Sequence, residues 1–213
     1  MKRIMSVLAL AAFASAPAAA QWAGMPVWNN PKGGTGVTIN GDLGIPNSNA
    51  GNGTAFGARG TLGLANISLT AGVANWKPKG STDSHTSVGG NAAFKVIGGS
   101  LIPVALNLQV GAASISAANL TPKTTRVTAG GGIAVSVPTP GLSIEPYLSV
   151  TNRWYKVSGV SGTNSNVGWT LGANVNFGMM GVHLAYDSES NSGSTNGIFA
   201  VGAHVALKAP IGM

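Results

Sequence analysis

The chain has little charge, few aromatic residues and no cysteine. Only 8% of its 213 residues are Asp, Glu, Lys or Arg, against about 25% in a typical soluble protein. So low a charge disfavours an ordinary soluble enzyme or a helix bundle, and also a disordered chain, which would be rich in charge. The absence of cysteine excludes a disulfide scaffold, a thiolate metal site and a lipid-modified N-terminal cysteine. Glycine, in contrast, occurs 32 times, roughly twice its usual share.

The first residues have the pattern of an export signal. Lys2 and Arg3 precede an apolar stretch at about residues 7–14, and an Ala-Ala-Ala run at 18–20 supplies a small-residue cleavage site. This predicts a signal peptide over residues 1–20, because the apolar run is too short for a membrane anchor. Its removal takes away two basic residues, so the formal net charge of +7 falls to +5. No later segment offers the ~20 apolar residues of a membrane helix, which leaves a secreted all-β protein or an outer-membrane β-barrel.

Apolar and polar residues alternate from residue 36 onward. Such a period of two predicts strands with one apolar and one polar face. Pro103 and Pro146 fall inside two of the segments. Proline within a sheet is confined to edge strands, strand starts or bulges, and because a closed barrel has no edge strand, a bulge at each proline would accommodate it. The ten alternating segments lie near residues 37–45, 55–64, 67–74, 87–96, 102–111, 126–137, 142–151, 167–177, 182–187 and 199–207.

The connections alternate between long and short. Long polar stretches occur near residues 46–53, 77–86, 114–123, 156–166 and 188–197, and between them, after an intervening strand, lie four short turns near residues 65–66, 98–100, 138–141 and 178–181. Long outer loops and short periplasmic turns are typical of outer-membrane barrels. The predicted fold is therefore all-β, a transmembrane antiparallel up-and-down β-barrel of ten strands, with eight or twelve as alternatives. It covers residues 36–207 and has both termini in the periplasm.

This architecture resembles the small outer-membrane β-barrels of Gram-negative bacteria, of the OmpA, OmpX and OmpW general type. The resemblance covers residues 36–207 and rests on strand pattern without a diagnostic motif. It implies a place in the bacterial outer membrane, contact with outer-membrane lipid and lipopolysaccharide, and folding by the barrel assembly machinery. Barrels of this kind usually end on an aromatic residue, whereas this chain ends on Met213, so residues 208–213 are expected to form a tail beyond the last strand.

Seven aromatic residues fall at the outer ends of the expected strands, where a girdle at the membrane interface would lie. They are Phe56, Trp76, Trp154, Tyr155, Trp169, Tyr186 and Phe199. Trp76 and Tyr155 are on the inward phase of their strands and fit the girdle less well. The outward phases of the ten segments carry no Lys, Arg, Asp or Glu, which disfavours the alternative of a secreted soluble β-sandwich.

The inward positions are mostly small and polar. Placing Gly44 opposite Gly57 brings Asp42 to face Arg59, which predicts an ion pair in the lumen. The small residues allow a narrow pore or a ligand pocket, and the alternative is a lumen plugged by large side chains and residues 21–35. Residues 21–35 are accordingly expected to form either a periplasmic N-terminal segment or a plug. The other large polar residues expected in the lumen are Lys95, Gln109, Glu145, Tyr147, His183 and His204. The two histidines face each other without a third ligand, so we expect no metal site and no cofactor.

The outer rim is expected to be basic. Counting across the turn at residues 138–141 places Arg126 opposite Arg153, where like charges repel unless an anion lies between them. A basic rim suits contact with lipopolysaccharide phosphates or anion preference in a pore, and the alternative is ordinary loop solvation. The lysines of the expected rim are Lys77, Lys79, Lys123 and Lys156. These charges are scattered, so nucleic acid is not expected as a partner.

Catalysis at the rim is a further alternative. The loop residues Asp83-Ser84-His85 and Asp187-Ser188-Glu189 would have to meet above the barrel within hydrogen-bond reach to form a hydrolase. Such residues are also common in ordinary loops, so no catalytic residue is assigned and the chain is not expected to be an enzyme. The sequence thus predicts a structural barrel or a narrow pore for small solutes, or else a barrel that binds lipopolysaccharide or host surfaces through its loops.

Overall fold

A computed structural model describes residues 22–29, 31, 33–99, 102–117, 120–191 and 193–207. The predicted signal peptide and the C-terminal tail at 208–213 lie outside these residues. The strands are β1 (Gly36–Pro46), β2 (Thr54–Leu64), β3 (Ile67–Lys77), β4 (His85–Gly99), β5 (Ile102–Ala117), β6 (Leu120–Val135), β7 (Val137–Thr139), β8 (Leu142–Val157), β9 (Asn164–Phe177), β10 (Met180–Asn191) and β11 (Ser194–Leu207). No helix in the described part of the chain is long and apolar enough to cross a bilayer.

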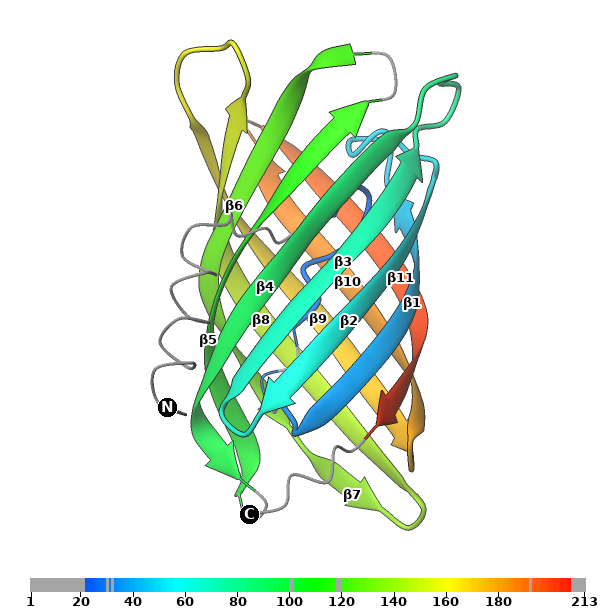
Figure 1. The fold of residues 1–213 in the computed structure, drawn as a ribbon, viewed down its shortest axis with the longest axis vertical. Helices are drawn as coiled ribbons and strands as arrows, with labels where there is room; N and C mark the ends of the chain where they lie inside the picture. Colours follow the sequence, from blue (N-terminus) through cyan, green and yellow to red (C-terminus); the bar gives the residue numbers. More distant parts are fainter. Residues whose placement is uncertain are drawn as a thin grey trace, which may run out of the picture.

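The strands form one closed antiparallel barrel (Figure 1). Consecutive strands are neighbours, the first strand pairs with the last, and the pairing of β6 with β8 completes the ring. Because β7 continues β6 along the same edge of β8, the barrel has ten strands. The prediction of a ten-stranded up-and-down barrel is confirmed. The alternating side chains give every strand one face for each side of the barrel wall.

The two strand prolines are accommodated differently. Pro103 lies beside a register shift in the β4–β5 ladder, between Ile97 and Gly99, as the expectation of a bulge requires. Pro146 produces no bulge: the pairs on either side of it, Ala134 with Tyr147 and Val137 with Ile144, keep one register. The ladder is only interrupted there, because proline has no N–H to donate, and this interruption separates β6 from β7.

Two of the expected outer loops are instead paired strands. Ala117 pairs with Leu120, and Asn191 pairs with Ser194, so β5–β6 and β10–β11 end in tight hairpins. The prediction of long loops at residues 114–123 and 188–197 is wrong because Ser, Thr and Asn were taken as loop residues. Polar residues on both faces are also compatible with a strand that rises into water beyond the membrane.

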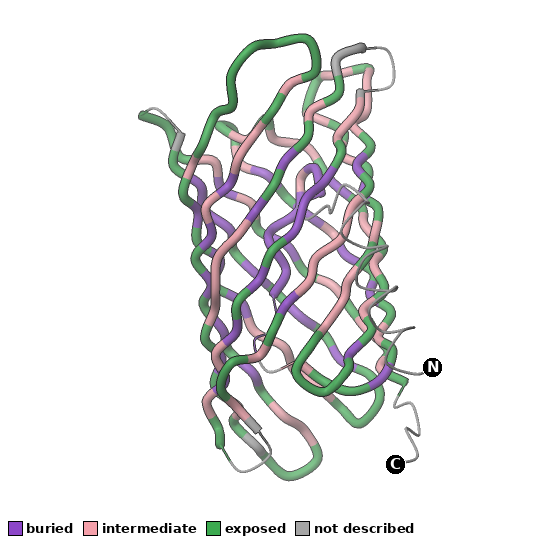
Figure 2. Tube along the Cα trace, turned by 60° about the vertical axis from the view of Figure 1, so that its left-hand side comes forward, coloured by how far each residue is buried: buried purple, intermediate pink, exposed green. Residues whose placement is uncertain are grey.

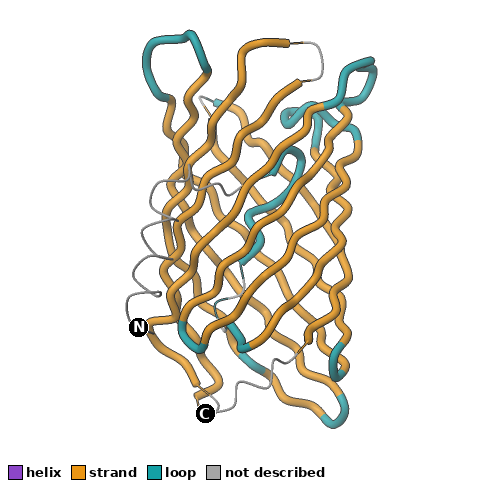
Figure 3. Tube along the Cα trace, in the orientation of Figure 1, coloured by secondary structure: helices purple, strands orange, loops and turns teal. Residues whose placement is uncertain are grey.

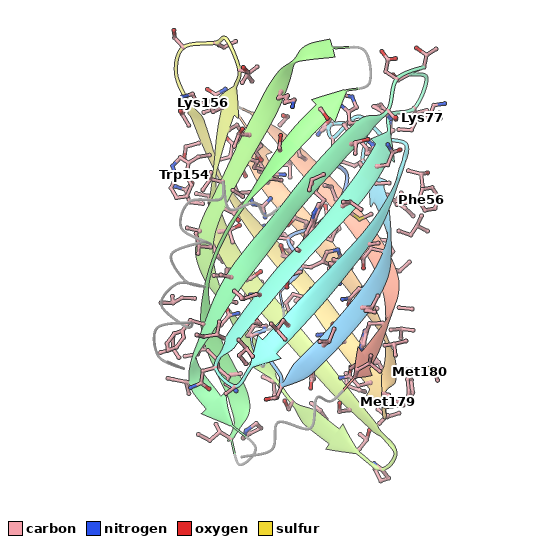
Figure 4. The ribbon with its side chains drawn as sticks, viewed as in Figure 1. Phe56, Lys77, Trp154, Lys156, Met179 and Met180 are labelled. Atoms are coloured by element: carbon pink, nitrogen blue, oxygen red, sulfur yellow. The ribbon has the colours of Figure 1, made fainter. Side chains whose placement is uncertain are left out.

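The outer face of the barrel is apolar and exposed. Ile39, Leu108, Val150 and Leu171 are 50 to 60% exposed, whereas the neighbours that point inward are covered, and the two classes alternate along each strand (Figure 2). Phe56 and Trp154 project outward near one end of the barrel, and Met179 and Met180 near the other (Figure 4). An apolar exposed surface this large marks a contact with another apolar phase, and on a closed barrel that phase is lipid.

Candidate functional site

Residues 22–29, here called the lumen segment, lie inside the barrel. Figure 3 shows the segment as the teal trace that passes between the walls. Trp22 is 5% exposed, Met25 1% and Trp28 8%, so the segment's large apolar side chains are buried although they lie in a lumen of mostly polar walls. Burial of the Met25 side chain alone stabilises this arrangement by about 2 kcal/mol.

The backbone of the lumen segment is bonded to side chains of the wall. Ala23 N donates to Ser87 Oγ at 2.8 Å, and Val27 N donates to Asp187 Oδ2 at 3.2 Å. Between them stands Pro26, which has no N–H and is itself buried. Asn29 and Asn107 exchange two side-chain hydrogen bonds, at 2.8 and 3.2 Å. Polar groups on β4, β5 and β10 therefore hold the segment.

The wall is shaped to receive the segment. Gly44 lies against the carbonyl oxygen of Gly24, and a Cβ at position 44 would overlap that oxygen. A Cβ at Gly57 would lie 3.1 Å from Met25 Cε. The alanines that pack with Trp22, Met25 and Trp28 in one cluster are Ala55, Ala74, Ala185 and Ala200. These small inward-facing residues thus leave space for the lumen segment, whereas the sequence alone was also compatible with an open passage.

A buried cluster of arginines and carboxylates crosses the lumen. Both terminal nitrogens of Arg153 donate to Asp187, each at 2.8 Å, and Arg153 Nη1 also donates to Glu189 at 3.0 Å. Arg126 and the Tyr155 hydroxyl donate to Glu189 as well. Arg153 is 0% exposed. We call Arg126, Arg153, Asp187 and Glu189 the upper charge cluster; it contains two positive and two negative groups.

A second polar cluster holds Trp28. Arg59 Nε donates to Asp42 at 2.7 Å, and His183 Nε2 donates to the same carboxylate at 2.6 Å. The Arg59 guanidinium lies 4.8 Å from the centre of a Trp28 ring, and the His183 ring meets Trp28 edge to face at 4.7 Å. The Nδ1 atoms of His183 and His204 are 3.1 Å apart. Arg59 on β2 and His183 on β10 thus both contact the Trp28 side chain.

A cavity of about 330 Å³ lies between this cluster and the end of the barrel with the short turns. Its walls include Asn29, Arg59, Glu145, Tyr147 and His204. Trp28 also lines it, so the cavity adjoins the lumen segment. The lumen therefore holds a polar vestibule at one end and the buried segment with the upper charge cluster beyond it.

The structure brings Asp42 and Arg59 together, but not in the expected register. Gly44 pairs with Ala55, so that Asp42 is opposite Gly57 and Arg59 is opposite Asn40. The prediction that Gly44 lies opposite Gly57 is wrong by two residues. Counting residues across the turn at 47–53 does not give the register in which this turn joins the two strands. Arg59 reaches Asp42 diagonally across the two strands.

The expected pair of facing arginines at a basic rim is wrong. Arg126 pairs with Tyr155, and Arg153 pairs with Thr128. Both arginines are buried and bound to carboxylates, so they add no free charge to the rim. The alternation over residues 182–187 places Asp187 on the inward phase, but the polar stretch 188–197 places Glu189 in the following loop. Continuing the inward phase of β10 from 187 to 189 would have found Glu189.

The remaining predicted residues divide between the two faces. Gln109, Glu145 and Tyr147 are buried in the lumen, and Lys95 is half-buried. The lysines of the expected rim are all exposed: Lys77, Lys79, Lys123 and Lys156. Of the expected girdle, Phe56, Trp154, Trp169, Tyr186 and Phe199 are on the outward phase.

Trp76 and Tyr155 do not belong to the girdle. The Trp76 indole N–H donates to the carbonyl oxygen of Asn52 at 2.9 Å, and its ring packs on the apolar cluster around the lumen segment. The Tyr155 hydroxyl is bound to Glu189. Their inward phase outweighs their position near the strand ends, because alternation decides the face on which a side chain lies.

The residues considered for a rim hydrolase have other partners in the structure. The His85 ring stacks on Trp76, with ring centres 5.0 Å apart, while Asp187 and Glu189 are bound to Arg153. These carboxylates are thus bound to arginine in the lumen and are not partners of His85. Within the described residues, no group of three or more His, Asp or Glu side chains is arranged to hold a metal ion.

Comparison with known proteins identifies the class through the fold. No family model and no curated protein matches the sequence. The β domain of the Bordetella autotransporter Brka is similar in structure, with 11% identity, a TM-score of 0.52 and coverage of 83% of this chain and 100% of that one. The chain covers 57% of a bacterial polysaccharide outer membrane secretin, with 73% of its own length, 9% identity and a TM-score of 0.48. The fold is thus that of the bacterial outer-membrane β-barrels.

Proposed function

We propose that this protein is a structural barrel of the bacterial outer membrane whose lumen is closed by its own lumen segment. The observation that carries the proposal is the burial of Trp22, Met25 and Trp28 between the walls. The upper charge cluster adds a second layer across the same lumen. Side chains that are buried to this degree and paired with each other leave little room for hydrated solutes, which favours a closed barrel over an open porin.

Conductance tests the proposal. Purified protein reconstituted into a planar bilayer is expected to give no discrete conductance steps, because the segment and the charge cluster occupy the lumen. Insertion is verified separately by the shift in gel mobility of the recovered protein on boiling, which a folded barrel shows. Steady, discrete steps from protein that passes this check would overturn closure and restore the narrow pore.

The membrane location makes its own prediction. Leu171 is in the middle of β9 and is 53% exposed on the outer face. Leu171→Arg is expected to lower the free energy of unfolding by about 2–4 kcal/mol, because it places a charge near the middle of the hydrocarbon. The matched control is Val160→Arg, at an exposed position between β8 and β9. Urea unfolding in lipid bilayers measures both, and equal effects would argue against lipid around β9.

A second candidate function, contact with lipopolysaccharide, is favoured by two lysines on neighbouring strands. Lys156 pairs with Thr125, and Ser158 N donates to the carbonyl oxygen of Lys123 at 2.9 Å. Both lysines are exposed, and Lys156 follows Trp154 on β8, at the level where the apolar surface ends (Figure 4). Because Arg126 and Arg153 are neutralised inside, these lysines supply the free charge of this side of the rim.

Removal of the two lysines tests this contact. The double substitution Lys123→Gln and Lys156→Gln is expected to weaken binding to vesicles that contain lipopolysaccharide by about 2 kcal/mol, since each lysine near an anionic surface contributes about 1 kcal/mol. Lys95→Gln, which changes a lysine near the short turns, is the control and should leave binding unchanged. Flotation of the refolded protein with such vesicles measures the effect, and equal binding by all variants would remove this candidate.

A further inference from the structure

We infer that the lumen is a peptide-binding site for an uncharged segment that begins with a turn and carries large apolar side chains, and that residues 22–29 occupy it in cis. The inference rests on the placement of the lumen segment in the proposed function. It goes further by treating the segment as a ligand that a second peptide of the same chemistry can replace.

The wall recognises the segment as a peptide. Ser87 Oγ accepts from one backbone N–H, and Asp187 accepts from another four residues later. Such contacts recognise the backbone, while the large side chains pack in one cluster with alanines of the wall, and other modes of peptide recognition likewise combine main-chain and side-chain contacts. Pro26 stands between the two bonded amides and adds no donor that the wall would have to satisfy.

Met25 and Trp28, two of the large side chains of the segment, contact different residues of the wall. Met25 lies against Gly57, and the backbone just before it lies against Gly44. Trp28 contacts the Arg59 guanidinium and the His183 ring. The charges nearest the segment are already paired with one another, which leaves an uncharged peptide as the matching ligand.

The covalent connection to β1 explains why the site is filled. A ligand on a short linker has an effective concentration in the millimolar range, so the lumen segment outcompetes a free peptide of similar affinity. The intact chain is therefore autoinhibited toward other peptides, and removal of the segment is needed to expose the site. Entry is from the end with the short turns, where the chain leaves the lumen to begin β1.

The experiment uses a refolded variant of the barrel that lacks residues 22–29. The probe is a synthetic peptide of residues 22–29 with a fluorophore at its C-terminus, and fluorescence anisotropy reports binding in detergent micelles. We expect saturable binding to the deletion variant and at least tenfold weaker binding to the intact chain. The same peptide with Met25→Asp should bind at least tenfold more weakly, because the residue-25 position offers no partner for a carboxylate.

A second pair of variants tests where in the lumen the peptide binds. In the deletion barrel, Gly44→Val should reduce peptide binding, whereas Gly41→Val, which has nothing within 4 Å of its Cβ, should not. If the deletion variant does not refold, the intact chain with Met25→Asp supplies the emptied lumen. Absence of binding to a folded emptied barrel would overturn the inference, as would equal binding of all peptides. A sealed bilayer with the intact protein would leave the proposed function standing in either case.

Discussion

Substitution of Arg153 by methionine is expected to lower the free energy of unfolding of the barrel by about 3–5 kcal/mol. Arg153 is 0% exposed, bonds both oxygens of Asp187 and also reaches Glu189. Its removal leaves the Asp187 carboxylate buried without its cation, and the loss of one partner of a buried ion pair has a cost of this size. Urea unfolding of the refolded protein in detergent or lipid, followed by tryptophan fluorescence, measures it.

The control for this prediction is Lys156→Met, an exposed lysine on the same strand. Exposed ion pairs contribute little, so that variant should differ from the wild type by less than about 0.5 kcal/mol. The double variant Arg153→Met with Asp187→Asn should be more stable than Arg153→Met alone, because no unpaired charge remains at this point. A loss below about 1 kcal/mol for Arg153→Met would show that water reaches the upper charge cluster and that this level of the lumen is open.

The second large effect is expected from Gly44→Val, which should displace the lumen segment. A side chain at position 44 overlaps the backbone of Gly24, and overpacking of this kind costs about 1–3 kcal/mol. The population of the displaced segment should therefore rise by about 5- to 150-fold. The chain has no native cysteine, so Met25→Cys gives a single thiol whose reaction rate with a polar maleimide follows this population.

The matched control is Gly41→Val on the same strand. Gly41 has nothing within 4 Å of its Cβ position, so its substitution should leave the thiol at position 25 as protected as in the parent. A thiol that reacts equally fast in the parent, the Gly44 variant and the Gly41 variant would show that Met25 is not enclosed by the wall.

The local alternation of apolar and polar residues was sufficient to predict the fold, but not the contacts between side chains in the lumen. The alternation in segments such as 37–45 determines which side chains face outward, because a strand places successive residues on opposite faces. That is why ten strands and an uncharged outer surface could be predicted. Which residues pair across two strands depends on the conformation of the turn that joins them. Counting residues across 46–53 therefore gave a register between the strands of Asp42 and Arg59 that is wrong by two residues.

Polar composition is a poor guide to structure where strands rise above the membrane. The predicted strand ends at Asp187, and Glu189 falls in the predicted loop because Ser, Asn and Gly surround it in the sequence. In the structure β10 continues to Asn191, which carries both carboxylates inward to Arg153. The composition of a segment does not distinguish a polar strand from a loop when both of its faces meet water.

No local sequence pattern predicts where the lumen segment lies. The sequence left residues 21–35 as either a periplasmic segment or a plug, because two tryptophans and two prolines are compatible with both. The segment is held by side chains that come from distant positions, such as Ser87 and Asp187. Only the closed barrel brings these residues to one place, so the site exists at the level of tertiary structure.

A disulfide between Ala23→Cys and Ser87→Cys tests the central claim most directly. Ala23 N lies 2.8 Å from Ser87 Oγ, which places the two side chains within reach of a disulfide in a chain without other cysteines. We predict that mild oxidation of the folded barrel in membranes links these two positions, as detected by mass spectrometry of proteolytic fragments. Ala23→Cys with Ser143→Cys, at the opposite end of the lumen near the short turns, should remain unlinked. Failure of the first pair to link, or equal linking of both pairs, in protein that keeps its heat-dependent gel shift would contradict a lumen closed by residues 22–29.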